Sequence, residues 1–185
     1  MSTTVAPPVH PELGVIYPIE DEARAHRARH VMAIARIVLG WTFLWAFLDK
    51  AFGFGYATER ADAWLNGGSP TFGFLNFATE GKTFHTFFAG LSGTTADWLF
   101  MVGLLGIGVA LILGIGMRIA AVSGVLLLLS MWAAGLPLAN NPITDSHIVD
   151  AVVIVALAVF GAGRTWGFGR AWEALPIVHR LPFLR

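Results

Sequence analysis

Two ionisable residues near the start of an apolar stretch are the strongest candidates for chemistry in this sequence. His147 and Asp150 lie in NNPITDSHIVDAVVIVALAVFGAGR, residues 140–164, just where the chain becomes apolar. On a helix, a spacing of three residues places both side chains on one face. A histidine titrates near neutral pH, and Asp150 on the same face can orient it and favour its charged form. The structural alternative is that the aspartate caps or matches the dipole of the helix N-terminus.

The composition places these residues in a membrane protein. Of the 185 residues, 56% are hydrophobic and 13% are charged, whereas about 25% of a soluble domain is charged. The length allows one compact domain. The formal net charge of zero excludes nucleic acid as an expected partner, because no basic face is large enough to neutralise a run of phosphates. Membrane lipid is therefore the expected surrounding.

The absence of cysteine restricts the redox chemistry that the chain can perform. It excludes a structural disulfide, an iron–sulfur cluster, a covalently attached haem and a thiol relay. A haem held by two histidines needs both on one side of a bilayer core about 30 Å thick, and His30 and His147 fall at opposite ends. Only His85 shares a side with His147, so we expect neither haem nor a metal site.

Hydropathy predicts an all-α membrane protein: a four-helix transmembrane bundle with a long outer loop that contains short interfacial helices. The N-terminal arm, residues 1–30, is expected to be extended and then to form a short basic surface helix. The transmembrane domain is residues 31–164, followed by a tail at residues 165–185. The predicted spans are residues 31–50, 96–117, 119–138 and 146–163, and the outer loop is residues 52–95. Gly106, Ala110 and Gly114, at four-residue steps, predict a close helix contact.

The outer loop is far longer than the usual connection between helices, which suggests a lid or a binding element. Residues 58–65 are predicted to form a capped short helix. Phe84, Phe87, Phe88 and Leu91 share one face of a second helix, which is expected to lie in the membrane interface. That aromatic face is more typical of packing or lipid anchoring than of a cofactor site.

The distribution of basic residues predicts the orientation. Most arginines lie in the N-terminal arm, at the turn around Arg118 and in the tail, whereas the long loop region holds only Lys50, Arg60 and Lys82. By the positive-inside rule both termini are cytoplasmic, in the cell (plasma) membrane. The loop and the start of the fourth span then face outward together.

Arg36 is the only charge within residues 31–48. At 1.5 Å per residue it lies about 8 Å from the inner end of the span, a depth that its side chain can cover by snorkelling to the interface. At the outer end, Asp49 and Lys50 are expected either to pair or to be solvated.

The outer half has groups suited to two kinds of ligand. A quinone needs an apolar slot with aromatic walls and proton donors, because it takes up two protons with two electrons. A small oxyanion needs cations and helix N-termini. The nearby aspartates repel an anion unless they are capped or protonated, so the sequence does not decide between a quinone and an oxyanion as the ligand. The candidate residues are His147, Asp150 and Asp49 for catalysis, Lys50, Arg36, Asn141 and His85 for substrate binding, and Trp41, Trp45 and Trp132 for a quinone.

Three stretches resemble the DoxX/DoxD family of four-helix membrane proteins. They are ARIVLGWTFLWAFLDK at residues 35–50, GLLGIGVALILGIGMRIAA at 103–121 and NNPITDSHIVDAVVIVAL at 140–157, followed by GAGRTWG. The loop sequence GGSPTFGFLN and the NNPITDSHIV stretch make the chain more similar to DoxD, the membrane subunit of thiosulfate:quinone oxidoreductase, than to short DoxX proteins. Many DoxX-type chains carry a glutamate early in the second span, where this chain has Leu104.

The resemblance implies oxidation of thiosulfate or a related reduced sulfur anion, with membrane quinone as the electron acceptor. It also implies a second protein subunit, and a homo-oligomer is the alternative partner. Other relatives imply a different function, a DoxX-type scaffold that holds soluble redox proteins at the membrane without catalysis of its own. A small transporter is a weaker interpretation, because proton-coupled export usually needs a carboxylate at mid-membrane depth.

Overall fold

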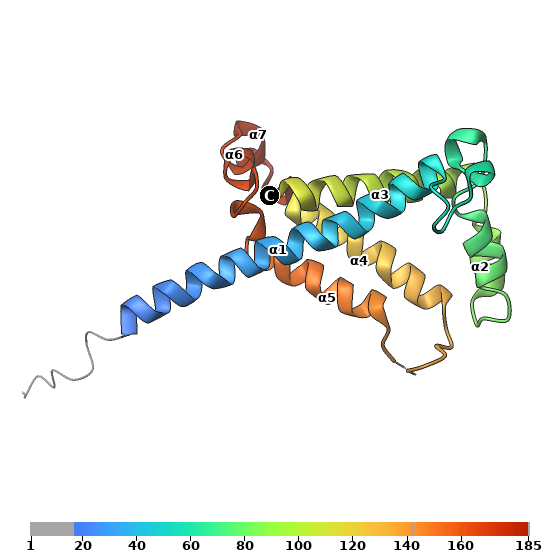
Figure 1. The fold of residues 1–185 in the computed structure, drawn as a ribbon, viewed down its shortest axis with the longest axis horizontal. Helices are drawn as coiled ribbons and strands as arrows, with labels where there is room; N and C mark the ends of the chain where they lie inside the picture. The colour runs from blue at the N-terminus through green and yellow to red at the C-terminus, as the bar shows by residue number, and fades with distance from the viewer. Residues whose placement is uncertain (1–16, 142, 185) are drawn as a thin grey trace, which may run out of the picture.

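The longer helices of the described part of the protein pack around one apolar core. The structure is a computed structural model that describes residues 17–141 and 143–184. Within these residues all regular structure is helical and there is no strand, which confirms the predicted all-α class. The four helices are α1 (Tyr17–Phe52), α3 (Thr94–Leu113), α4 (Met117–Ala134) and α5 (Ser146–Val159), drawn in Figure 1.

Three helices are long and apolar enough to cross a membrane: α1 from Glu22 to Phe52, α3 and α4. They indicate a membrane protein, as the composition predicts. The apolar helix α5 has only 14 residues, about 21 Å at the usual rise, and is shorter than a hydrocarbon core of about 30 Å. It ends at Val159, whereas the predicted span continues to residue 163, because Gly161 turns the chain with a φ of 64°. Similarly, α3 ends at Leu113 because Gly114 is a left-handed C-cap.

The first helix is longer than predicted. It begins at Tyr17, so a separate surface helix before residue 31 is wrong; the rest of the predicted arm, residues 1–16, lies outside the described residues. Residues 19–39 contain neither proline nor glycine, so nothing in the sequence breaks the helix there. The side chains from Glu22 to Arg29 are all exposed, and this part of α1 extends beyond the other helices (Figure 1).

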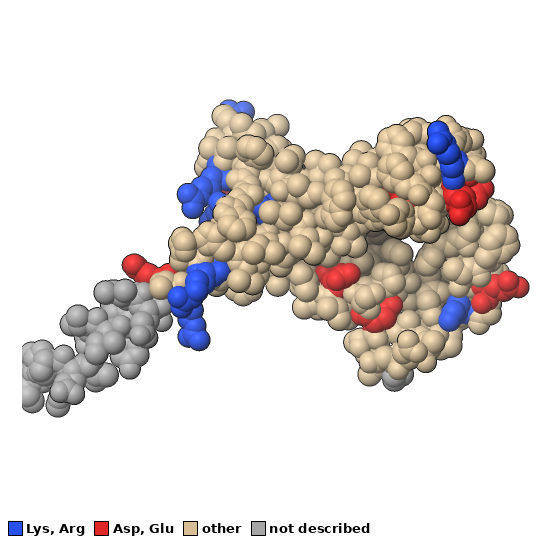
Figure 2. Space-filling view, in the orientation of Figure 1, with Lys and Arg blue, Asp and Glu red and all other residues tan. Residues whose placement is uncertain are grey.

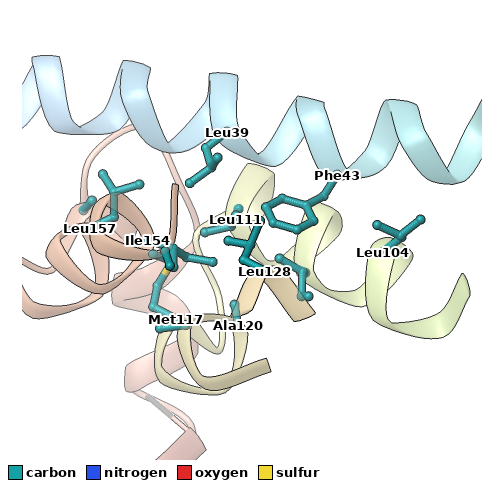
Figure 3. Packing of buried hydrophobic residues seen from close by; sticks show 13 residues of the cluster. Leu39, Phe43, Leu104, Leu111, Met117, Ala120, Leu128, Ile154 and Leu157 are labelled. Carbon is teal, nitrogen blue, oxygen red and sulfur yellow. The ribbon is translucent and has the colours of Figure 1, made fainter. Parts of the chain in front are cut away.

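One apolar core holds the four helices together. Contacts are most extensive between α1 and α3 and between α4 and α5, and far fewer join α1 to α5. Core side chains come from all four helices (Figure 3): Leu39, Phe43, Leu104, Ile107, Leu111, Met117, Ala120, Leu128, Ile154 and Leu157. The bundle is therefore two helix pairs that meet along α3 and α4.

Glycines allow α1 and α3 to approach closely, but not all of those that the sequence predicts. A Cβ at Gly108 would lie 2.7 Å from the backbone nitrogen of Leu44, and Gly40 is equally crowded against α3. Gly106 is exposed, and a Cβ there would meet nothing within 4 Å. Gly114 does make a close contact, but with the tail. The predicted small-residue face is therefore wrong at Gly106.

The loop between α1 and α3 is a series of short helical turns. These are η1 (Arg60–Asp62), η2 (Trp64–Asn66), the π-helical turn η3 (Gly73–Ala78) and α2 (His85–Gly90). The single helix predicted at residues 58–65 is wrong, because two 3₁₀ turns separate at Ala63. A small second core of Leu75, Phe88 and Ala134 packs the loop against α4.

The turn η4 (Ala162–Arg164) follows α5, and the tail then folds back on the bundle as α6 (Gly169–Glu173), α7 (Pro176–Arg180) and η5 (Pro182–Leu184). The backbone N–H of Phe168 donates to the carbonyl of Leu113 at 2.8 Å, which ties the tail to the end of α3. We call this end of the bundle, with the turn between α3 and α4, the tail end. The opposite end, with residues 53–93 and the start of α5, is the loop end.

Candidate functional site

His147 forms a hydrogen-bonded pair with Asp145 at the start of α5. One carboxylate oxygen of Asp145 accepts from the backbone N–H of His147 at 3.0 Å and of Ile148 at 3.4 Å, which makes Asp145 the N-cap. The other oxygen lies 2.7 Å from Nδ1 of His147. Both side chains are 27% exposed. The sequence spacing predicts that Asp150 orients His147. The residue that does so in the structure is Asp145.

The electrostatics of this pair favour an ionised Asp145. Partial desolvation acts to raise the pKa of Asp145, but the hydrogen bonds and charge of His147 and the N–H groups of Ile148 and His147 outweigh it, so the pKa is lowered. A carboxylate accepts hydrogen bonds, so Nδ1 of His147 is the donor in this contact. Nε2, which has no hydrogen bond among the described residues, is left for a ligand or a proton.

Asp150 lies one turn further along α5. It is half-buried and forms no side-chain hydrogen bond or ion pair within the described part of the chain. Its helical position places it on the same face as His147 and the buried Ile154. An unpartnered carboxylate on the core-facing side of an apolar helix is a functional-site candidate.

The loop end is hollowed between the two helix pairs. Figure 2 shows a hollow between the part of the molecule formed by α1 and α3 and the part formed by α4 and α5, with acidic side chains at the start of α5 beside it. The limited contact between α1 and α5 agrees with this separation. The titratable groups at the start of α5 thus lie next to open space.

A strip of aromatic rings runs along α1 toward the same end. The ring centroids of Trp41 and Trp45 are 5.8 Å apart, and Trp45 stacks on Phe54 at 5.8 Å and meets Tyr56 edge-on at 5.3 Å. Trp41 is 51% exposed. Trp132 is not part of this strip, because its Nε1 donates to a backbone carbonyl in the connection between α4 and α5 at 3.0 Å.

Asp49 and Lys50 have different environments, and the expectation that they pair or are solvated is wrong for Asp49. Asp49 is 2% exposed, and its carboxylate accepts from the backbone N–H of Ala57 at 2.9 Å and of Tyr56 at 3.4 Å. It fixes the chain as it leaves α1. Lys50 is half-buried, with Nζ 6.0 Å from the centroid of the Phe100 ring on α3 and no ion pair among the described residues.

Arg36 is fully buried, so the snorkelling predicted from its depth is wrong. Nη1 donates to the carbonyls of Leu111 and, at 2.9 Å, Ile112, while Nη2 donates to Thr165 at 3.2 Å and Trp166 at 2.9 Å. The carbonyls at the C-terminus of α3 lack partners within their own helix, which makes them good acceptors for a cation. This geometry gives Arg36 a structural role at the tail end in place of the substrate-binding role expected from the sequence.

Two further substrate-binding candidates are held in local loop contacts. His85 Nδ1 lies 2.8 Å from Oγ1 of Thr79. The side-chain oxygen of Asn141 accepts from the backbone N–H of Ile143 at 2.9 Å and of Thr144 at 3.1 Å. The structure therefore does not bring His85 and Asn141 together with Lys50 in one anion site.

A buried carboxylate that is not among the candidates from the sequence makes three hydrogen bonds at the start of α3. Asp97 is 7% exposed, and its Oδ1 accepts from Oγ of Ser69 at 2.8 Å and from the N–H and Oγ1 of Thr71 at 3.1 and 2.6 Å. It anchors the loop to the first turn of α3. The hydroxyl residues on either side of Pro70 are the signal that could have identified it.

The fold brings His147 and Asp150 to one face of α5 and places the Trp41 and Trp45 rings in contact. The other candidate residues are held in separate local contacts. The described residues contain no group of three histidine, aspartate or glutamate side chains that could hold a metal ion. Their fold and site define the chain as a helical membrane protein with titratable groups at its loop end. Comparison of the chain with protein-family models, curated proteins and solved structures finds no match.

Proposed function

We propose that this chain is the membrane subunit of a quinone-linked oxidoreductase of the DoxX/DoxD type, which oxidises thiosulfate or a related reduced sulfur anion. The resemblance of residues 35–50, 103–121 and 140–157 supplies the reaction class. The observation that carries the proposal is the start of α5, where the His147–Asp145 pair and the unpartnered, half-buried Asp150 lie one turn apart.

The chemistry of the reaction explains why titratable groups are needed. Two thiosulfate ions that join through a new S–S bond release two electrons and no proton. A quinone that accepts these electrons also needs two protons to become the quinol. In the proposal, His147 and Asp150 donate these protons and recover them from water at the loop end. Asp145 orients His147 through the hydrogen bond between its carboxylate and Nδ1.

The quinone head group is proposed to bind against the strip of Trp41 and Trp45, which is apolar and partly exposed. Quinone sites need such aromatic walls beside a small number of polar groups. Lys50, on the same helix and facing α3, is the proposed cation for the sulfur anion. Trp132 stays a weaker candidate because it is already bonded to the backbone.

The proposed topology has four membrane segments, with α5 and the turn η4 together forming the fourth. Arg118, Arg164, Arg170 and Arg180 all belong to the tail end, whereas the loop carries few basic residues. The positive-inside rule then assigns both termini to the cytoplasm and the loop end to the outer face of the cell membrane.

Thiosulfate-dependent reduction of a short-chain quinone by the purified protein tests the proposal. We expect His147→Ala and Asp150→Asn each to lower kcat by about 100-fold, the usual effect of losing an acid–base group. Asp62→Asn, which alters an exposed loop carboxylate, is the matched control and should keep full turnover. Full turnover in both site variants would remove the site from the proposal.

Quinone binding provides a second measurement that does not depend on the electron donor or on a second subunit. A quinone bound beside Trp41 and Trp45 quenches their fluorescence, so titration with a short-chain quinone should reduce the emission. The double variant Trp41→Phe and Trp45→Phe should lose most of this quenching, whereas Trp172→Phe at the tail end should not. Equal quenching in all three proteins would place the quinone elsewhere.

The exposed part of α1 favours a second candidate function, the scaffold without catalysis. The side chains from Glu22 to Arg29 are exposed and the helix extends beyond the bundle, as expected of a segment that binds a soluble redox protein. A pull-down with and without residues 1–30 separates the two functions. Loss of partners without residues 1–30 supports the scaffold, whereas turnover that is retained without these residues supports the enzyme subunit.

A further inference from the structure

A pocket at the tail end has no part in the proposed function. It has a volume of about 190 Å³ and lies where the first turn of α4, the last turn of α5 and the helix α6 meet. The proposed quinone and proton groups are at the opposite end of the bundle. Its lining combines charged, aromatic and apolar side chains, which points to a ligand with both a charged and an apolar part.

Two guanidinium groups from different elements form the charged wall. Arg118 of α4 donates through Nη1 to the carbonyl of Pro182 at 2.9 Å, and its guanidinium forms no other hydrogen bond or ion pair among the described residues. Arg164 of η4 is bound to Glu173 of α6, with Nη2 2.8 Å from Oε2 and Nε 3.1 Å from Oε1. Glu173 is the one acidic side chain in the described lining. Its carboxylate is paired with the guanidinium of Arg164, which is the contact that a phosphate would make.

The lining also has an exposed apolar part. Val159 and Phe160, at the end of α5, are 75% and 70% exposed. Trp172 of α6 also lines the pocket, and tryptophan is enriched at the level of lipid head groups. The pocket lies at the ends of helices that are apolar enough to span a membrane. Figure 2 shows basic side chains gathered at this end.

We propose that this pocket binds the phosphate of an anionic phospholipid, with the acyl chains along Val159 and Phe160. Basic pockets between membrane helices at head-group depth bind such lipids. Arg118 supplies a guanidinium of which only Nη1 is hydrogen-bonded among the described residues, and Arg164 becomes a second contact when it exchanges Glu173 for the phosphate. The first turn of α4, which no described side chain caps, adds N–H groups beside these arginines. Glu173 thus acts as an internal competitor for the lipid.

Thermal unfolding of the delipidated protein in neutral detergent tests the proposal. We expect dioctanoyl phosphatidylglycerol to raise Tm in a concentration-dependent way, because a ligand that binds the folded state stabilises it. Dioctanoyl phosphatidylcholine and inorganic phosphate should leave Tm unchanged. Arg118→Gln should weaken phosphatidylglycerol binding about tenfold, the effect of losing one charge-assisted hydrogen bond. Glu173→Gln should strengthen it, because the competing carboxylate is gone.

Arg60→Gln, which removes an exposed arginine at the loop end, is the control and should bind the lipid as the original chain does. Equal shifts with phosphatidylcholine and phosphatidylglycerol would overturn the proposal, as would unchanged binding in Arg118→Gln. Weaker binding of phosphatidylglycerol to Glu173→Gln would overturn the proposal that Glu173 competes with the phosphate for Arg164. A shift with inorganic phosphate alone would assign the pocket to a soluble phosphate and overturn the lipid assignment.

Discussion

Arg36 shows how a buried charge is held without an acidic partner. Its two Nη atoms face four backbone carbonyls from the end of α3 and from the tail, and its Nε has no partner in the described residues. Burial of a cation is costly, and only well-directed acceptors offset that cost. The carbonyl end of a helix is such an acceptor, because it carries the negative end of the helix dipole.

Replacement of Arg36 by Met should therefore destabilise the protein. The apolar side chain fills much of the space but leaves several buried carbonyls without donors, which we expect to lower the free energy of unfolding by about 3 kcal/mol or more. Unfolding in mixed micelles measures this quantity. Arg29→Met, at an exposed position on the same helix, should change it by less than about 0.5 kcal/mol. Equal effects of the two substitutions would contradict the structural role.

The lowered pKa of Asp145 predicts a pH dependence. Because the pKa in the folded state lies below the usual 3.8, the ionised carboxylate stabilises the fold above that value. This stabilisation is lost as the pH falls through the lowered pKa of the folded state. Asp145→Asn keeps a good N-cap but has no charge to lose. The difference in Tm between the two proteins should be largest at neutral pH and shrink below about pH 4; a constant difference would contradict the assignment.

At the residue scale, sequence reasoning identifies His147 but assigns it the wrong partner. Helical spacing brings Asp150 to the same face, yet Asp145 at the N-cap is already held by the first N–H groups of α5, so its second oxygen meets the imidazole. Arg36 shows the same limit. Its depth in the helix can be counted from the sequence, but the carbonyls that hold it come from residues 111–166, which only the fold brings together.

The contact between α1 and α3 depends on which glycines face the neighbour. Both α3 and α4 are apolar on all sides, so periodicity in the sequence does not show which face is buried. Four-residue spacing favours a face that includes Gly106, whereas the structure packs Gly108 against Leu44. The presence of the three long apolar helices can be predicted from average hydropathy. The face that each helix buries cannot, because average hydropathy carries no direction.

Substitution of two glycines on one helix tests this packing. Gly108→Ala should lower the free energy of unfolding by about 1–3 kcal/mol, because the new methyl group forces α1 and α3 apart. Gly106→Ala should be neutral or stabilise the protein by up to about 1 kcal/mol, because the site is open and alanine favours the helix. Thermal unfolding in detergent distinguishes the two. The reverse order would show that α3 presents its other face to α1.

For the whole molecule, the positions of the long helices along the chain are more predictable than the structure of the loop. Long apolar stretches predict α1, α3 and α4, because each satisfies its own backbone within the membrane. The loop is held by contacts between distant residues, such as Asp97 with Ser69 and Thr71, which local sequence does not encode. The short α5 differs from its predicted span because glycine conformation, and not hydropathy, ends it.

The cysteine-free chain permits a direct test of topology. A single cysteine at Glu80 in the loop should react with a membrane-impermeant maleimide added to intact cells. A single cysteine at Arg170 in the tail should react only after the cells are opened. Both positions are exposed, so a difference in labelling reports the side of the membrane. Labelling of both, or of neither, from outside would contradict four membrane segments with cytoplasmic termini.

The unbroken α1 has a mechanical consequence. Its 36 residues form a rod about 54 Å long, and Arg36, clamped by four carbonyls, lies close to its midpoint. A tilt that a ligand imposes at Trp41 and Trp45 would therefore swing the far arm, from Glu22 to Arg29, in the opposite direction, as a lever turns about a fulcrum. A ligand bound at Trp41 and Trp45 would then change the position of the segment from Glu22 to Arg29, and a protein bound to that segment could respond to the change.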